Sequence, residues 1–259
     1  MTTMTVRMNA EDAELVRKFA QFEGVTISDF ARKAILEKIE DSYDLQELRE
    51  AIAHDSGERF SIDEILAAPL VADPLTLPMC APLSDGASAA VLASAEGVQR
   101  LQAERPLRLL ASVLRTGSRR EPRDYANHVC RLAAQQAYEQ AGVDPADIDV
   151  AEVHDAAAFG EIVQTECLAF CAPGEGGALA QSGQTRLGGR LPVNPSGGLE
   201  SKGHPLGATG LAQVYELAHQ LRGTAQGRQV PDARLAIAEN GGGLIGVEEA
   251  VTCITILGS

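Results

Sequence analysis

The segment VNPSGGLESKGHPLGATG, which begins at Val193, restricts the fold of this chain more than any other stretch of the sequence. Five glycines surround one histidine, His204, and glycine permits tight turns and close approach of backbone to a ligand. Pro205 follows the imidazole, and a helix is expected just beyond, where its first N–H groups can face an anion. The pattern predicts that His204 is presented to a ligand. The alternative is a glycine-rich connector with an incidental histidine.

Strands alternate with helices on both sides of this segment, and two strands follow one another at the end. This order is typical of a mixed α/β sheet with helices on its faces. A glycine-rich loop is expected at 174–190. We predict strands at 108–114, 148–153, 191–194, 233–238 and 250–257, a further small-residue strand within SDGASAAVLAS from Ser84, and helices at 96–103, 125–141, after His154, and at 208–221.

The helix predicted at 208–221 is apolar around most of its circumference, with Gln213 and Glu216 as the principal breaks. A helix of this kind is normally covered on more than one side. We therefore expect Leu211 and Val214 to form an exposed apolar surface that drives self-association.

The first forty residues form a separate pattern of one strand and two helices. Residues 3–8 alternate between apolar and polar side chains, and the first amphipathic helix should stop at Gly24. Thr26 and Asp29 have the spacing of a capping box at the start of the second helix. Because so short a unit cannot close a core alone, dimerisation is expected.

This layout resembles the ribbon-helix-helix domain of bacterial antitoxins over roughly residues 4–39. The resemblance implies that Thr3, Thr5 and Arg7 point at base edges of operator DNA, and that Thr26 and Ser28 anchor a backbone phosphate. The acidic stretch that follows would be a linker, or a segment that folds around a toxin. We place these units at 1–40 and 41–70, because prolines and small residues replace charged ones near Pro69.

Charge and cysteine usage exclude several classes of protein. A net charge of -14 argues against a chain that coats nucleic acid indiscriminately. No CxxC pair suggests a zinc site or a disulfide framework, so the cysteines are interpreted as cytosolic thiols, most of them small core residues. No apolar run is long enough to span a bilayer and no signal peptide is evident, so we expect a cytoplasmic protein without membrane contact. The five cysteines are Cys80, Cys130, Cys167, Cys171 and Cys253.

The segment around His204 resembles the glycine-histidine-proline motif of thiolases. VHDAAAFGEI from Val153 resembles the histidine-aspartate-cysteine-phenylalanine block of the sterol-carrier type of thiolase. SDGASAAVLAS is similar to the last strand of the family's N-terminal half, and AENGGGLIG to its closing hairpin. The resemblance runs from about Ala72 to the C-terminus and implies a thiolase-like C-terminal domain at 71–259.

The resemblance implies acyl-CoA chemistry, with a coenzyme A thioester as substrate and neither a bound cofactor nor a metal. His204 would polarise a thioester oxygen and help to activate a nucleophile, and His154 would complete an oxyanion hole. Gly203, Gly242 and Gly243 would line the bound ligand. For His154 the alternative is a histidine at a strand end that bonds to backbone.

Three departures from the thiolase pattern limit catalysis by this chain. The family's N-terminal half, with its nucleophilic cysteine, is replaced by the antitoxin-like segment. The cysteine of the histidine-aspartate block is Ala156, and its phenylalanine is Ala157. A second base position, a cysteine in other thiolases, falls near Asn240, which is not a base.

We therefore hypothesise a thiolase-like acyltransferase component that is inactive alone and works as a homo-oligomer or with a complementary thiolase-like chain. The alternative is a DNA-binding, toxin-neutralising antitoxin fused to a thiolase fragment. A third hypothesis is a fusion with no settled activity.

Overall fold

The computed structural model describes residues 8–36, 38–39, 46 and 60–259. The chain divides into two compact units, Met1–Phe60 and Ser61–Ser259. Thr3, Thr5 and Arg7, together with most of the strand predicted at 3–8, lie outside the described residues.

The described residues of the first unit are mainly helical. Helix α1 spans Ala10–Phe22 and begins where the Asn9 side chain accepts a hydrogen bond from the Asp12 N–H at 2.8 Å. It ends before Gly24, whose φ of +70° confirms the predicted left-handed stop. Residues 27–36 are also helical. The predicted cap is confirmed, because Thr26 Oγ1 accepts from the Asp29 N–H at 3.0 Å and donates to the Asp29 carboxylate at 2.7 Å.

The second unit is built on a four-stranded sheet in the order β3-β6-β5-β4. β3 pairs with β6 and β6 with β5 in antiparallel fashion, whereas β4 is parallel to β5. The expected mixed α/β fold is therefore confirmed. The strands span Arg108–Thr116 (β3), Val150–Glu152 (β4), Leu235–Gly242 (β5) and Val251–Gly258 (β6).

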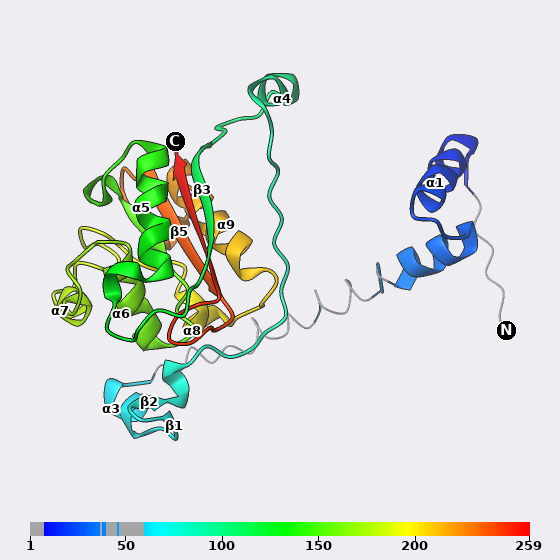
Figure 1. The fold of residues 1–259 in the computed structure, drawn as a ribbon. Helices are drawn as coiled ribbons and strands as arrows, with labels where there is room; N and C mark the ends of the chain where they lie inside the picture. The colour runs from blue at the N-terminus through cyan, green and yellow to red at the C-terminus, as the bar shows by residue number, and fades with distance from the viewer. Residues whose placement is uncertain (1–7, 37, 40–45, 47–59) are drawn as a thin grey trace. The chain divides into compact units, whose positions relative to one another are not determined.

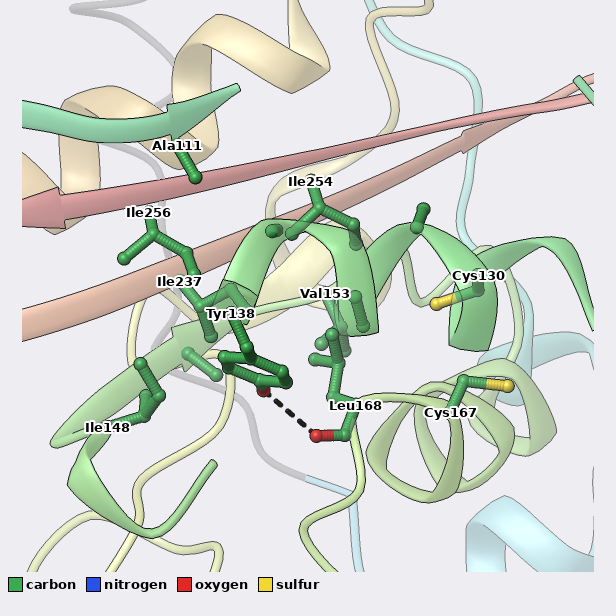
Figure 2. Close-up of a cluster of buried hydrophobic side chains, with 14 of the residues drawn as sticks. Ala111, Cys130, Tyr138, Ile148, Val153, Cys167, Leu168, Ile237, Ile254 and Ile256 are labelled. Atoms are coloured by element: carbon green, nitrogen blue, oxygen red, sulfur yellow. Dashed lines mark hydrogen bonds between the residues drawn. The ribbon is translucent and has the colours of Figure 1, made fainter. Parts of the chain in front are cut away.

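Two long helices cover opposite faces of this sheet (Figure 1). Helix α5 (Val129–Ala141) and helix α9 (Thr209–Arg222) each bury one side against the strands. Figure 2 shows the cluster under α5, in which Ile237, Ile254 and Ile256 of the central strands are fully buried. The Tyr138 hydroxyl donates to the Leu168 carbonyl at 2.8 Å and so ties α5 to the end of α6.

Shorter elements connect these layers. Among the described residues, no helix is both long and apolar enough to cross a membrane. The shorter helices and strands are α3 (Ile62–Ala67), β1 (Leu70–Ala72), β2 (Leu75–Thr76), α4 (Ala95–Leu101), α6 (Ala158–Cys167), α7 (Gly176–Gln181) and α8 (Gly198–Lys202), with 3-10 turns at Leu77–Met79, Tyr125–Asn127, Pro145–Asp147 and Gln226–Arg228.

Two predicted strands were wrong. The stretch 84–94 is extended but pairs with no strand of the described chain, and Val91 and Leu92 are exposed. A strand needs a hydrogen-bonding neighbour, which its own sequence cannot supply. The strand predicted at 191–194 is reduced to a single parallel bridge between Val193 and Ala151.

One helix boundary differs from the predictions, and two helices were not predicted. The helix expected at 125–141 opens with the 3-10 turn, and α5 proper begins after His128, whose side chain accepts from the Cys130 N–H. Helix α7 lies inside the expected loop at 174–190, and α8 lies inside the glycine-rich segment. Both segments are rich in glycine, and that composition led to the prediction of loops.

The orientation of α9 reverses the sequence interpretation of its faces. Gln213 and Glu216, taken as breaks in an apolar surface, are buried, whereas Leu211 is 43% exposed and Val214 packs against the core. Buried polar groups need hydrogen-bond partners, and each of these side chains has at least one, although Oε1 of Gln213 has none. Gln213 donates to the Glu239 carbonyl at 2.8 Å, and Glu216 accepts from Arg228 at 2.8 Å.

Candidate active site

Three segments far apart in sequence meet at one end of the sheet. The first leaves β4 at His154 and enters α6, the second carries His204 into α9, and the third is the extended stretch at 80–84. The Ala81 N–H donates to the Ala156 carbonyl at 3.1 Å, and the His204 N–H donates to the Pro82 carbonyl at 2.8 Å. The third segment therefore joins the two histidine loops.

The two predicted site histidines are brought together. Nε2 of His154 lies 3.3 Å from Nε2 of His204, within hydrogen-bond distance. Nδ1 of His204 lies 2.7 Å from the Thr209 hydroxyl, and that hydroxyl donates its one proton to the Pro205 carbonyl at 3.1 Å. With the hydroxyl proton on the Pro205 carbonyl, His204 donates from Nδ1 to Thr209, and Nε2 of the neutral ring is left as an acceptor. His154 consequently donates from Nε2.

Both imidazoles are held in the neutral form. Burial lowers the pKa of His154 to about 4, and repulsion from His204 adds to the effect. Burial also lowers the pKa of His204. At neutral pH the pair thus presents one N–H donor and one nitrogen lone pair, the two functions that acyl transfer needs from general acid-base and oxyanion groups.

Buried carboxyl groups fix the backbone under His154. The His154 N–H donates to Glu239 of β5 at 3.0 Å, and Asp155 accepts from the Leu199 N–H of α8 at 2.8 Å. Gly198 has a φ of +64°, and a Cβ there would lie 1.9 Å from the Asp155 carboxylate. Glycine is therefore required at this position for the two loops to approach.

The predicted lining glycines take different positions. Gly203 has a φ of +82° and packs against Ser84, so it shapes the histidine loop. An added Cβ on Gly242 would meet Val251, and one on Gly243 would meet Ala250. The glycine of this run that approaches the pair is Gly241, where a Cβ would lie 3.3 Å from Nδ1 of His154.

An open pocket of about 340 Å³ lies at the N-terminal end of α9, and neither histidine of the pair lines it. It is lined by residues 84–88 of the extended stretch and 205–208 of the histidine loop. Asn240 lies close to the first turn of the same helix, since a Cβ on Gly210 would be 3.4 Å from its Oδ1. The Nδ2 group of Asn240 is buried without a hydrogen-bond partner.

Sequence reasoning missed three residues that support the pair. Thr209 bonds to Nδ1 of His204, Glu239 holds the His154 backbone, and Gly241 leaves room for the His154 ring. Thr209 could have been found, because it follows the histidine closely, at the start of the expected helix. The other two lie on β5, and their contacts depend on strand register.

The structure places the remaining site predictions elsewhere. Thr26 and Ser28 are exposed at the start of the second helix of the first unit, and Thr26 is engaged as a cap. Ala156 is exposed and Ala157 precedes α6, so neither supplies a titratable group. Among the described residues, no group of histidine, cysteine and carboxylate side chains has the geometry to hold a metal ion.

Comparison with protein families yields two matches. The model described as thiolase C-terminal domain-like matches residues 111–257. A family of unknown function, DUF6290, matches residues 1–68.

Comparison with individual proteins agrees with the first match. Sterol carrier protein 2 of Oryctolagus cuniculus is 44% identical over 190 residues, which are 71% of this chain and 35% of that protein. Acetyl-CoA acetyltransferase of Methanothermobacter thermautotrophicus is 41% identical over 188 residues, 71% of this chain and 49% of that protein. Benzoylsuccinyl-CoA thiolase subunit BbsB of Thauera aromatica is 39% identical over 186 residues, with 71% and 48% covered. The chain thus spans between a third and a half of the length of these relatives.

A solved structure shares the fold. The Ltp2-ChsH2(DUF35) aldolase superposes with a TM-score of 0.64, at 22% identity, over 95% of this chain and 62% of that chain.

Proposed function

Because the chain belongs to the thiolase C-terminal domain-like family over residues 111–257, we propose that it is an acyltransferase component acting on coenzyme A thioesters. The observation that carries this proposal is the neutral pair of His154 and His204, with their Nε2 atoms 3.3 Å apart. Similar proteins bear names that refer to acyl-CoA substrates, which supports the substrate class.

The tautomers assign one role to each ring. A thioester carbonyl oxygen entering the site would replace His204 as the acceptor of the His154 Nε2–H. That N–H would then stabilise the oxyanion formed when a nucleophile adds to the carbonyl carbon. The displaced Nε2 lone pair of His204 would be free to accept the proton of the attacking group.

A second chain is proposed to supply the nucleophile. Ala156 cannot transfer a proton, and Asn240 can donate a hydrogen bond but cannot act as a base. Phe159, Leu206 and Leu244 are each more than 60% exposed, although each lies within a few residues of the site. A rim of large exposed apolar side chains is a feature of protein interaction sites, and a complementary thiolase-like chain would cover it.

Binding of acetyl-CoA to this chain alone tests whether the two histidines form a thioester-binding site. We expect saturable binding by calorimetry that weakens at least about tenfold in His204→Ala and His154→Ala. His219→Ala is the matched control, because His219 lies near the other end of α9 and bonds only within that end of the helix and its turn. Equal affinity in all four proteins would overturn the assignment of the site.

Turnover tests the second step. The chain alone should neither cleave nor form a 3-ketoacyl-CoA above background, and activity should appear when a chain with a thiolase nucleophile half is added. Activity of the chain by itself would contradict the proposal of a shared site.

For the first unit we propose a ribbon-helix-helix, antitoxin-like role in DNA and toxin binding. The observation that favours it is a pair of capped helices whose apolar side chains are exposed: Leu15 at 55%, Phe19 at 51% and Phe22 at 88%. So small a unit needs a second copy to bury them. Salt-sensitive binding to one operator, lost in Arg7→Ala and retained in Arg17→Ala, would support this role. Equal binding to unrelated DNA sequences would contradict it.

A further inference from the structure

A second cluster of reactive groups lies where the start of α5 meets the end of α6. Cys130 is fully buried at the start of α5, and Cys167, 7% exposed, is the last residue of α6 (Figure 2). The two thiols are within hydrogen-bond reach of each other, and His128 is within reach of Cys167. The backbone N–H of Cys130 donates to Nδ1 of His128 at 3.2 Å. Three chemically reactive side chains therefore meet, although sequence reasoning treated the cysteines as core packing.

Cys167 of this cluster lines a pocket that is separate from the one at the start of α9. Cys167 lines an open pocket of about 500 Å³ together with Arg131, Tyr138 and the turn after α5. The pocket shares no lining residue with the one at the start of α9. A small reagent can therefore approach Cys167 without entering the proposed acyl-CoA site.

The environment separates the two thiols chemically. A hydrogen bond from Cys130 and another from His128 lower the pKa of Cys167 to about 6. Burial, followed by the hydrogen bond to Cys167, raises the pKa of Cys130. Burial alone would lower the pKa of His128, but the hydrogen bond to Cys167 and the charges of Cys167 and Glu249 raise it. Glu249, Glu239 and Arg120 are the other charged groups that act on the cluster.

We propose that Cys167 is a peroxide-reactive thiol and Cys130 its resolving partner, so that a hydroperoxide converts the pair to a disulfide linking α5 to α6. In the first step the Cys167 sulfur bonds to one peroxide oxygen as the O–O bond breaks. The other oxygen leaves with the former thiol proton, as water from hydrogen peroxide or an alcohol from an organic hydroperoxide. In the second step the Cys130 sulfur displaces the sulfenic hydroxyl of Cys167, which departs as water with the Cys130 proton. The hydroperoxide is reduced by two electrons and the two thiols are oxidised.

The remaining cysteines provide the contrast. Burial and nearby carboxylates raise the pKa of Cys171. A thiol with a pKa of about 6 is roughly nine-tenths thiolate at pH 7, against a few per cent for an ordinary thiol. The lower intrinsic nucleophilicity of the more acidic thiol offsets part of this advantage, so several-fold faster oxidation of Cys167 than of Cys171 is expected.

Mass mapping of the intact wild-type chain provides the test. After brief exposure to hydrogen peroxide at pH 7, the chain is unfolded, alkylated and digested. We expect Cys130 and Cys167 to lose alkylation together, in a linked peptide two hydrogens lighter than its parts that dithiothreitol separates. Alkylation of both residues at the untreated level, with Cys171 oxidised first, would overturn the proposal.

Three variants locate the roles. Cys130→Ala should stop at a sulfenic acid on Cys167 that dimedone traps, and Cys167→Ala should leave Cys130 reduced. Cys171→Ser is the matched control and should behave as wild type. Equal oxidation of Cys130 in wild type and in Cys167→Ala would refute the assigned order of the steps.

Discussion

Helices α5 and α9 cover opposite faces of one sheet, yet they are stabilised by different chemistry. The buried side of α5 is apolar, with Ala133, Ala134 and Ala137 almost completely buried. The buried side of α9 carries Gln213, Glu216 and Gln220 beside Leu217, while Leu211 and Tyr215 are exposed. The sequence predicted both helices, but the faces that it indicated for the helix at 208–221 were wrong.

The difference follows from what each helix must satisfy. Gln220 accepts from the Val230 N–H at 2.7 Å and donates to the Arg228 carbonyl at 2.8 Å, so it closes the backbone of the loop after α9. Gln213 caps the carbonyl of Glu239, next to the candidate site. Polar residues on α9 thus bond to backbone groups of β5 and of the loop that follows the helix, whereas the buried side of α5 contacts the sheet through apolar side chains.

The largest effect should come from the apolar residue at the centre of the buried side of α9. Leu217→Ala removes a fully buried side chain and should lower the free energy of unfolding by about 2–5 kcal/mol. Leu211→Ala, on the same helix, should change it by less than about 0.5 kcal/mol. Urea denaturation of both variants provides the measurement. Equal losses would show that both sides of α9 are packed.

The histidines of the candidate site and the histidine at the start of α5 should respond to pH in opposite directions. His154 and His204, near α9, have lowered pKa values, whereas the pKa of His128, at the start of α5, is raised. Stability from neutral His154 is present above pH 6.5 and is lost as the pH falls toward about 4. Stability from protonated His128 is present below pH 6.5 and is lost as the pH rises through its folded pKa.

Unfolding curves of paired variants separate these contributions. The stability advantage of wild type over His154→Asn should narrow by up to about 3 kcal/mol between pH 6.5 and 4. The advantage over His128→Asn should instead narrow as the pH rises above 6.5. Parallel curves for wild type and both variants would contradict the opposite shifts.

The sequence predicted the mixed sheet and singled out His154 and His204, because strands and motifs leave local patterns. The strands predicted at 233–238 and 250–257 correspond to β5 and β6, and glycine with proline around His204 indicated a loop. The sequence did not predict that the two histidines contact each other. The sequence could not show that residues 84–94 fail to form a strand, because a strand also needs a neighbouring strand to pair with. It also could not show that Glu239 and Gly241 support His154, or that Cys167 meets His128, since these contacts join residues more than 35 positions apart.

The polar network under α9 should contribute less than Leu217. Gln220→Ala leaves the Val230 N–H and the Arg228 carbonyl without their partners, which should cost about 1–3 kcal/mol. Gln135→Ala on the exposed side of α5 is the matched control and should fall within about 0.5 kcal/mol of wild type. A Gln220→Ala protein as stable as its control would mean that water replaces the network at no cost.

The smallest effect on stability, and the most informative for assembly, should come from the outer side of α9. Leu211 and Tyr215 are 43% and 59% exposed, four residues apart on one face, so Leu211→Ser with Tyr215→Ser should leave the unfolding free energy within about 0.5 kcal/mol of wild type. Sedimentation velocity should nevertheless show less self-association, because the exposed apolar surface is reduced. Val214→Ser should do the reverse, with reduced stability and unchanged association, since Val214 packs on the sheet. If the double variant and wild type sediment alike, α9 does not form the contact between chains, and the rim of Phe159, Leu206 and Leu244 becomes the surface to test.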